Sequence, residues 1–214
     1  MTEKTITIKK GKHSEKQLSW LFDKMTSKRL VAEVKFHENC LYDPLPTDYR
    51  PCRFSQPKNC RGDWNKLIGL MKPSIHPHKN SARIVWRVDQ KIKKIQLGYY
   101  VYVDWIAPNS SAPWYCRGYN TAQKGLMTEF IEVDKWYWIQ IEDFDYLYEF
   151  KTPQKVVGYE TKNKDYAYIN HRGESKTHNV KERKYKRPNL ILPYFGGNCK
   201  APHDITISFK FHQL

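Results

Sequence analysis

The chain has 214 residues, of which 37 are Lys or Arg and 22 are Asp or Glu, so its formal net charge at pH 7 is +15. This length supports one well-buried core, and an aromatic content of 14% excludes a disordered chain. Because a surplus of positive charge raises the local concentration of anions, we expect a single domain over residues 1–214 that meets a negatively charged partner.

The first 30 residues predict an N-terminal strand followed by one short helix. Residues Thr5–Lys9 alternate between apolar and polar side chains, as a strand does. Ser14 and Gln17 have the spacing of a capping box, and apolar residues then recur with helical spacing, which predicts a helix over Glu15–Met25. The residues with this spacing are Leu18, Leu21, Phe22 and Met25.

No segment of the sequence predicts a membrane span or an export signal. The N-terminus, Met1–Lys12, lacks the apolar core of a signal peptide, and no later stretch approaches the roughly 20 apolar residues that cross a bilayer. We therefore expect no membrane partner and a cytoplasmic location, or a place in the virion if the protein is encoded by a phage. Its oligomeric state stays open.

The cysteines predict neither a zinc site nor a redox motif. They are odd in number and irregularly spaced, and no C-x-x-C pair occurs among Cys40, Cys52, Cys60, Cys116 and Cys199. We expect most of them to be reduced packing residues, and we expect no cofactor and no metal.

The middle of the chain predicts strands around a long loop. Leu30–Phe36 alternates as a strand, and Glu38–Asp63 contains four prolines and predicts an irregular loop. Trp64–Met71 is compatible with either a strand or a short turn of helix. Arg83–Val88 and Lys94–Val103 are two alternating runs joined by a polar stretch, which is typical of a hairpin.

The alternation in this hairpin assigns its two faces. Ile84, Trp86 and Val88 share one face of the first run, so Arg83 and Arg87 lie on the other. In the second run Tyr100 and Tyr102 lie opposite the apolar residues. The apolar face is expected inside, which leaves a sheet surface that carries two arginines and two tyrosines.

The remaining segments complete a β-rich pattern. Further strands are predicted at Leu126–Val133, Trp136–Ile141, Phe144–Phe150, Leu190–Phe195 and Asp204–His212, and residues 153–187 are expected to form a polar basic insertion. Many short strands separated by turns predict an all-β fold, an antiparallel β-sandwich of jelly-roll type with one short helix.

Three stretches resemble a set of uncharacterised bacterial and phage proteins with a jelly-roll fold of the concanavalin-like kind. These stretches are D-W-N-K-L-I-G at Asp63–Gly69, H-K-N-S-A-R at His78–Arg83 with Trp86 and Arg87, and P-Y-F-G-G-N at Pro193–Asn198 with A-P-H-D-I at Ala201–Ile205. The resemblance implies the fold and no activity, because jelly rolls host lectins, glycan hydrolases, polysaccharide lyases and viral structural proteins.

The candidate ligand-binding residues combine cations, imidazoles and phenol rings. Guanidinium groups hold carboxylate or phosphate bidentately, and tyrosine rings offer a stacking surface to sugars or bases. A Gly-Gly turn near the C-terminus adds a possible pocket edge. The residues are His76, His78, Lys79, Arg83, Arg87, Tyr100 and Tyr102, with Tyr194, Lys200 and His203 at the turn. An ordinary solvated sheet face with arginine stems over tyrosine rings explains the hairpin residues equally well.

The sequence favours a non-catalytic binding module for an anionic ligand, either nucleic acid or nucleotide, or an acidic glycan. One alternative is a phage or cellular structural protein whose basic surface contacts DNA or neighbouring subunits. Another is a jelly-roll polysaccharide lyase, in which an arginine, a histidine and a tyrosine would act on an acidic sugar. A glycosidase needs two carboxylates that face each other, and the acids closest together in the sequence are Glu142, Asp143, Asp145 and Glu149. Their alternation with aromatic residues indicates instead an ordinary strand with one solvated face.

Overall fold

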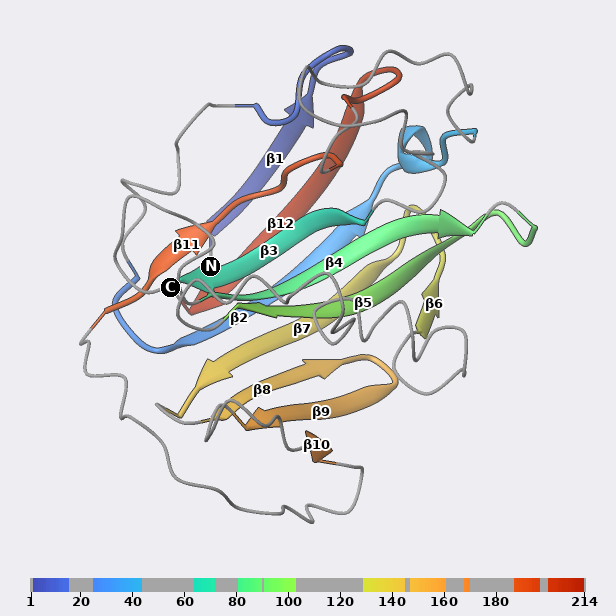
Figure 1. The fold of residues 1–214 in the computed structure, drawn as a ribbon. Coiled ribbons are helices and arrows are strands. Elements are labelled where there is room, and N and C mark those ends of the chain that lie inside the picture. Colours follow the sequence, from blue (N-terminus) through green and yellow to red (C-terminus); the bar gives the residue numbers. More distant parts are fainter. Residues whose placement is uncertain are drawn as a thin grey trace, which may run out of the picture.

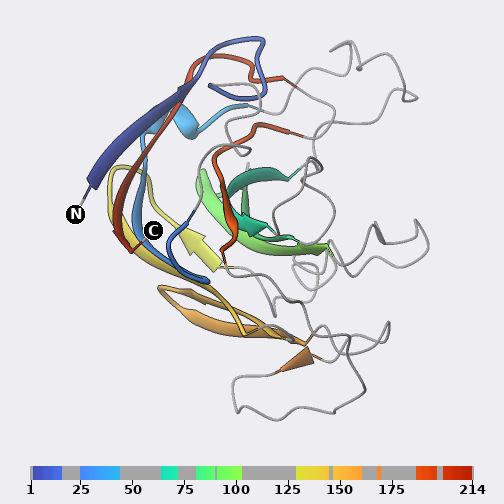
Figure 2. The same cartoon turned by 90° about the vertical axis from the view of Figure 1, so that its left-hand side faces the viewer.

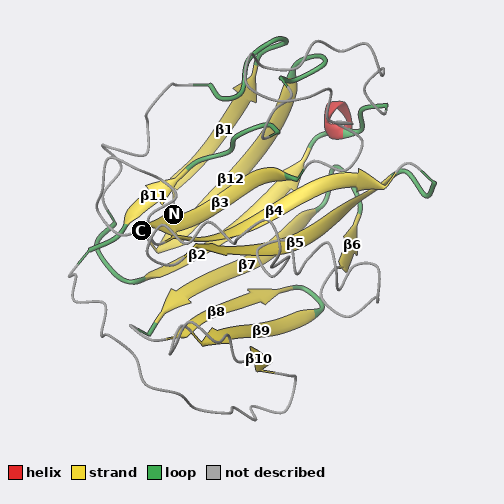
Figure 3. Cartoon of the chain, viewed as in Figure 1, coloured by secondary structure: helices red, strands yellow, loops and turns green. Residues whose placement is uncertain are grey.

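The computed structural model describes residues 2–15, 25–43, 64–71, 81–89, 91–102, 129–144, 147–160, 168–169, 187–196 and 200–213. Over these ranges the chain forms the strands β1 to β12, with one 3-10 turn, η2 (Glu38–Cys40) (Figures 1 and 3). In the described residues, no helix is long and apolar enough to cross a membrane.

The larger sheet has seven strands in the order β1-β12-β2-β7-β8-β9-β10. All of its pairings are antiparallel. Its strands are β1 (Thr2–Ile8), β12 (Ile205–Gln213), β2 (Arg29–Phe36), β7 (Trp136–Asp143), β8 (Leu147–Thr152), β9 (Lys155–Glu160) and β10 (Tyr168–Ile169).

The smaller sheet has five antiparallel strands in the order β11-β3-β4-β5-β6. Its strands are β11 (Asn189–Ile191), β3 (Asn65–Met71), β4 (Ser81–Asp89), β5 (Lys94–Tyr102) and β6 (Glu129–Ile131). Tyr194 extends this sheet by an isolated bridge to Lys66 at the beginning of β3.

Strands that are distant in the sequence pair side by side in both sheets. The first strand, β1, lies beside the last, β12, and β12 in turn lies beside β2 (Figure 1). In the smaller sheet β11 pairs with β3. The predicted all-β fold, an antiparallel sandwich of jelly-roll type, is therefore confirmed.

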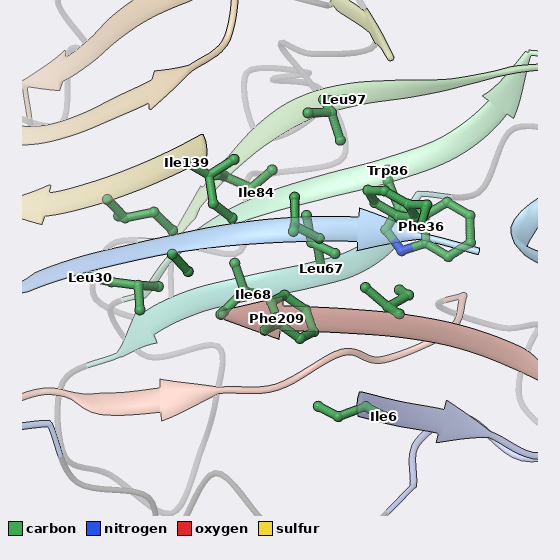
Figure 4. Close-up of a cluster of buried hydrophobic side chains, with 14 of the residues drawn as sticks. Ile6, Leu30, Phe36, Leu67, Ile68, Ile84, Trp86, Leu97, Ile139 and Phe209 are labelled. Atoms are coloured by element: carbon green, nitrogen blue, oxygen red, sulfur yellow. The ribbon is translucent and has the colours of Figure 1, made fainter. Parts of the chain in front are cut away.

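The core lies between the two sheets. Figure 2 shows the seven-stranded sheet as a curved layer with β3, β4 and β5 against its concave side. Alternate residues of each strand point into this space, so Leu30 and Phe209 of the larger sheet meet Ile68 and Ile84 of the smaller one (Figure 4). Trp86 is completely buried and lies edge-on to Phe36, with ring centroids 5.2 Å apart.

Most of the strands predicted from alternation are present with shifted ends. Of the two possibilities for Trp64–Met71, the structure has the strand, because Asn65–Met71 pairs with both β4 and β11. Residues 16–24 of the predicted helix Glu15–Met25 lie outside the described residues, so that helix stays a prediction.

The polar stretch 153–187 contributes strands that alternation did not predict. Lys155–Glu160 forms β9 beside β8, and Tyr168–Ile169 forms β10 beside β9. These strands extend one end of the seven-stranded sheet. Residues 161–167 and 170–186 lie outside the described part of the chain.

Candidate functional site: the outer face of the five-stranded sheet

The central hairpin has the register that the sequence predicted. Arg83 pairs with Tyr100, and Arg87 pairs with Gln96. Because Ile84 and Trp86 are buried in the core, both arginines and their cross-strand partners lie on the outer face of the sheet. Tyr102 pairs with Ser81 on this same face. The predicted pairing of the two runs and the outward direction of Arg83 and Arg87 are confirmed.

Several predicted ligand-binding residues fall where the structure gives no description. His76, His78 and Lys79 lie in residues 72–80, outside the described ranges. Tyr100 and Tyr102 belong to β5, and their side chains lie outside the described part of the chain. Their part in ligand binding stays a prediction.

Arg83 is far less exposed than a residue on the open sheet surface that alternation predicted. Only 4% of its surface is exposed. Its aliphatic stem crosses Gly69 on β3, where a Cβ atom would lie 2.7 Å from Arg83 Cγ. The backbone carbonyl of Ala82 would be closer still to this Cβ atom, so a larger residue at position 69 would have to move the β4 backbone as well as the arginine. Alternation assigns a side chain to a face but cannot tell whether that face is covered.

Arg87 lies against a tryptophan that sequence reasoning did not select. Its guanidinium carbon is 4.6 Å from the centroid of the Trp64 ring, and its Nε donates a hydrogen bond to Gln96 Oε1 at 2.6 Å. A planar guanidinium over an indole gains a cation–π attraction and is fixed in orientation. Arg87 is half-buried and keeps part of its surface open.

Trp64 is held flat on the sheet because β5 has a glycine beneath it. A Cβ atom at Gly98 would lie 3.0 Å from both Cη2 and Cζ3 of the indole and 3.4 Å from Val85 Cγ2. Trp64 is 5% exposed, and its Nε1–H has no hydrogen-bond partner in the described part of the chain. An indole N–H that is buried without a partner costs about 1–3 kcal/mol.

Lys66 connects the backbone of Trp64 to the edge of the sheet. Its Nζ donates to the carbonyl oxygens of Trp64 and Gly196, both at 3.0 Å. The same ammonium lies 6.0 Å from the ring centroid of Tyr194, whose backbone pairs with that of Lys66. The neighbouring Asn65 accepts from the N–H of Gly196 at 2.6 Å, which fixes the turn at this glycine of positive φ.

His13 closes this edge from the segment that follows β1. Its imidazole stacks on the ring of Tyr194, with centroids 5.0 Å apart and planes inclined by 7°. His13 Nδ1 lies 2.9 Å from the carbonyl oxygen of Phe195, and the N–H of Phe195 donates to the carbonyl of His13. Tyr194 remains 36% exposed.

These contacts form a continuous series that we call the cation–ring row. It consists of Arg87, Trp64, Lys66, Tyr194 and His13, in that order. Arg87 and Tyr194 were predicted as site residues, whereas Trp64, Lys66 and His13 were missed. A signal for Trp64 and Lys66 existed in the D-W-N-K stretch, but their side-chain directions depend on the start of β3 and on its irregular pairing after Lys66.

Lys200 and His203, the other two predicted residues, make no described contact with this row. Lys200 is exposed, and His203 Nε2 lies 2.8 Å from the carbonyl oxygen of Asn39 in η2. The next residue, Asp204, bonds to the Lys9 ammonium and the Lys10 N–H, and the Lys9 hydrogen bond is the main cause of its lowered pKa. This arrangement ties β1 to β12. Roles for Lys200 and His203 in binding stay predictions.

The described acids are mostly engaged by cations. Glu132 lies between Lys135 and Lys94, and the hydrogen bond from Lys135 is the main cause of its lowered pKa. Glu142 and Glu149 are cross-strand neighbours on β7 and β8, where they pair with Arg29 and Lys151. In the described ranges no group of three or more His, Cys, Asp or Glu side chains is placed to hold a metal ion.

Cys40 is the cysteine that falls within the described residues, and it is a free thiol buried in the core. Its Sγ donates to the carbonyl oxygen of Thr206 at 3.0 Å. Burial raises the pKa of this thiol far above its usual range, which keeps it neutral. For Cys40 the predicted role as a reduced packing residue is confirmed.

Comparisons with known proteins assign no family. No family model matches the sequence, and no curated protein matches it. Among solved structures, one match is a glycosyl hydrolase family protein from Mycobacterium fortuitum, with 13% sequence identity and a TM-score of 0.33. The alignment covers 89% of this chain and 65% of the other, so the chain spans less than two thirds of that protein. A TM-score this low is no basis for a shared activity. The class defined by the fold is an all-β antiparallel sandwich.

Proposed function

We propose that this protein is a non-catalytic binding module for an anionic ligand, which is received on the cation–ring row. The observation that carries the proposal is the Arg87–Trp64 pair. A half-buried guanidinium lies over an indole whose own N–H has no partner in the described residues. The pair offers an anion a charged planar donor that the indole holds in a fixed orientation.

The charge of the whole chain supports an anion over a neutral ligand. A net charge of +15 attracts polyanions from solution and speeds their encounter. The row supplies what long-range attraction lacks, namely a guanidinium held in a fixed geometry and, at the other end of the row, the partly exposed ring of Tyr194. The candidate ligands are nucleic acid or nucleotide, and acidic glycan.

The test replaces Arg87 with glutamine and compares it with a charge-matched control. Lys91→Gln in the exposed β4–β5 turn removes the same charge from the same hairpin without touching the row. Binding of labelled oligothymidylate and of heparin is measured by fluorescence anisotropy at several salt concentrations. A charge-assisted contact is worth about 1.5–3 kcal/mol, so Arg87→Gln should weaken binding roughly ten- to a hundredfold, and Lys91→Gln far less.

Two further measurements sharpen this result. Arg87→Lys should recover only part of the loss, because an ammonium keeps the charge but lacks the planar fork. The logarithm of wild-type affinity should fall linearly with the logarithm of salt concentration.

Equal losses of affinity in Arg87→Gln and Lys91→Gln would reject the row as the site, provided that urea denaturation shows both variants to be folded. Unsaturated products that absorb in the ultraviolet, formed from an acidic polysaccharide, would favour a lyase instead.

A further inference from the structure

The opposite face of the sandwich carries a second group of rings and cations. Trp136 and Trp138 lie two residues apart on β7, and both point outward because Ile139 and Ile141 point into the core. Trp138 is 41% exposed. In Figure 2 the outer face of the seven-stranded sheet turns away from the five-stranded sheet, so this surface is separate from the cation–ring row.

Two lysines from two other strands converge on Trp136. Lys35, on the neighbouring strand β2, places its Nζ 5.1 Å from the ring centroid. Lys210 reaches across β2 from β12 and places its Nζ 4.0 Å from the same centroid. The indole quadrupole attracts both ammonium groups and holds two like charges on one ring. We call Lys35, Trp136, Trp138 and Lys210 the tryptophan–lysine patch.

The two ammonium groups form no ion pair in the described part of the chain, although Glu3 and Glu33 flank Lys210 in the register. Within the described ranges neither Lys35 nor Lys210 makes an ion pair or a hydrogen bond. Glu33 on β2 is the direct cross-strand neighbour of both Lys210 and Trp138, and its carboxylate is bound by His212 at 2.8 Å. Glu3 is opposite Lys210 on β1 but forms no ion pair with it. Both ammonium groups are therefore held over Trp136 without an ion pair, where they can receive a phosphate.

We propose that the tryptophan–lysine patch binds single-stranded nucleic acid, with a base stacked on Trp138 and a phosphate held by Lys35 and Lys210. A nucleotide combines one flat ring with one negative charge, and the patch presents one exposed indole beside one pair of ammonium groups. Stacking of bases on aromatic side chains tolerates any sequence, because every base has a π-face. This surface is additional to the cation–ring row and does not depend on it.

The first test separates base stacking from attraction to phosphate. An oligothymidylate of about 12 nucleotides is compared with an abasic strand of the same length, which keeps the phosphates and lacks the bases. Wild-type protein should bind the oligothymidylate about tenfold more tightly. Trp138→Ala should lose this preference. Phe144→Ala removes a ring that is equally exposed, at 41%, and lies outside the patch, so it should keep the preference.

The second test addresses the lysines. The double variant Lys35→Gln/Lys210→Gln should reduce the slope of log affinity against log salt by about 0.7, since the two lysines hold one phosphate and each phosphate contact on a single strand contributes about 0.7. Lys10→Gln/Lys91→Gln removes the same charge from exposed side chains outside the patch and should change the slope less.

Three outcomes would overturn the proposal. The first is equal affinity of the wild-type protein for the two strands, and the second is an unchanged base preference in Trp138→Ala. The third is that Trp138→Ala loses as much affinity for heparin as for oligothymidylate. Such a result would make the patch a glycan-binding surface. Arg87→Gln distinguishes the two sites, because it should weaken binding to both strands without changing their ratio. Suppose that Trp138→Ala abolishes the preference for oligothymidylate over the abasic strand while Arg87→Gln leaves the affinity for both strands unchanged. That result would support this patch and reject the row.

Discussion

Replacing Gly98 with alanine adds one methyl group directly beneath the Trp64 indole. The new Cβ would lie 3.0 Å from Cη2 and Cζ3 of the ring, whereas carbon atoms pack best at about 3.5–4.0 Å. The ring or the strand must therefore move by about 0.5–1 Å. Because Arg87 rests on this indole, the movement should disturb the guanidinium without removing any charge.

The expected change in stability is the difference between two effects. Overpacking costs about 1–3 kcal/mol, and replacing a glycine inside a strand regains about 0.5–1 kcal/mol. The free energy of unfolding should fall by roughly 0–2.5 kcal/mol. Affinity for oligothymidylate should fall by about two- to thirtyfold, since a displaced cation–π pair is worth about 0.5–2 kcal/mol.

The assay is urea denaturation together with fluorescence anisotropy on Gly98→Ala, Trp64→Phe and the double variant. Phenylalanine lacks the far part of the indole, so Trp64→Phe should leave space for the new methyl group. The double variant should then be more stable than the sum of the single effects predicts, by at least about 0.5 kcal/mol. Strictly additive effects would show that Trp64 does not lie on Gly98, and the cation–ring row would lose its central member.

Two other perturbations test the core and the link between the termini. Trp86→Ala should lower the free energy of unfolding by about 3–5 kcal/mol, because it empties the ring cluster with Phe36, Tyr42 and Phe195; a smaller change in urea denaturation would contradict its burial. The lowered pKa of Asp204, caused first by its hydrogen bond from Lys9, should stabilise the fold above the unfolded-state pKa, an effect lost as the pH falls through the folded-state pKa. Unfolding measured from pH 6 to pH 2 should therefore depend less on pH in Asp204→Asn than in the wild type, and equal dependence would show that the Lys9 contact contributes nothing.

The sequence by itself determined the strands and their faces. A strand that borders a core must alternate, so Ile84 and Trp86 had to point inward and Arg83 and Arg87 outward. The same reasoning predicted the central hairpin and the sandwich class. Pattern alone failed for Lys155–Glu160, where a polar composition concealed β9 at one end of the sheet.

Only the tertiary structure decided which side chains meet. Alternation gave Arg83 a face, but its burial depends on Gly69 and on what covers that face. Trp64 needs the glycine of another strand beneath it, and Lys210 reaches Trp136 only because β12 lies beside β2. These contacts join residues that are distant along the chain, and their pairing follows from the strand order. A local period carries no information about strand order, because it reports only which side of its own strand a residue occupies.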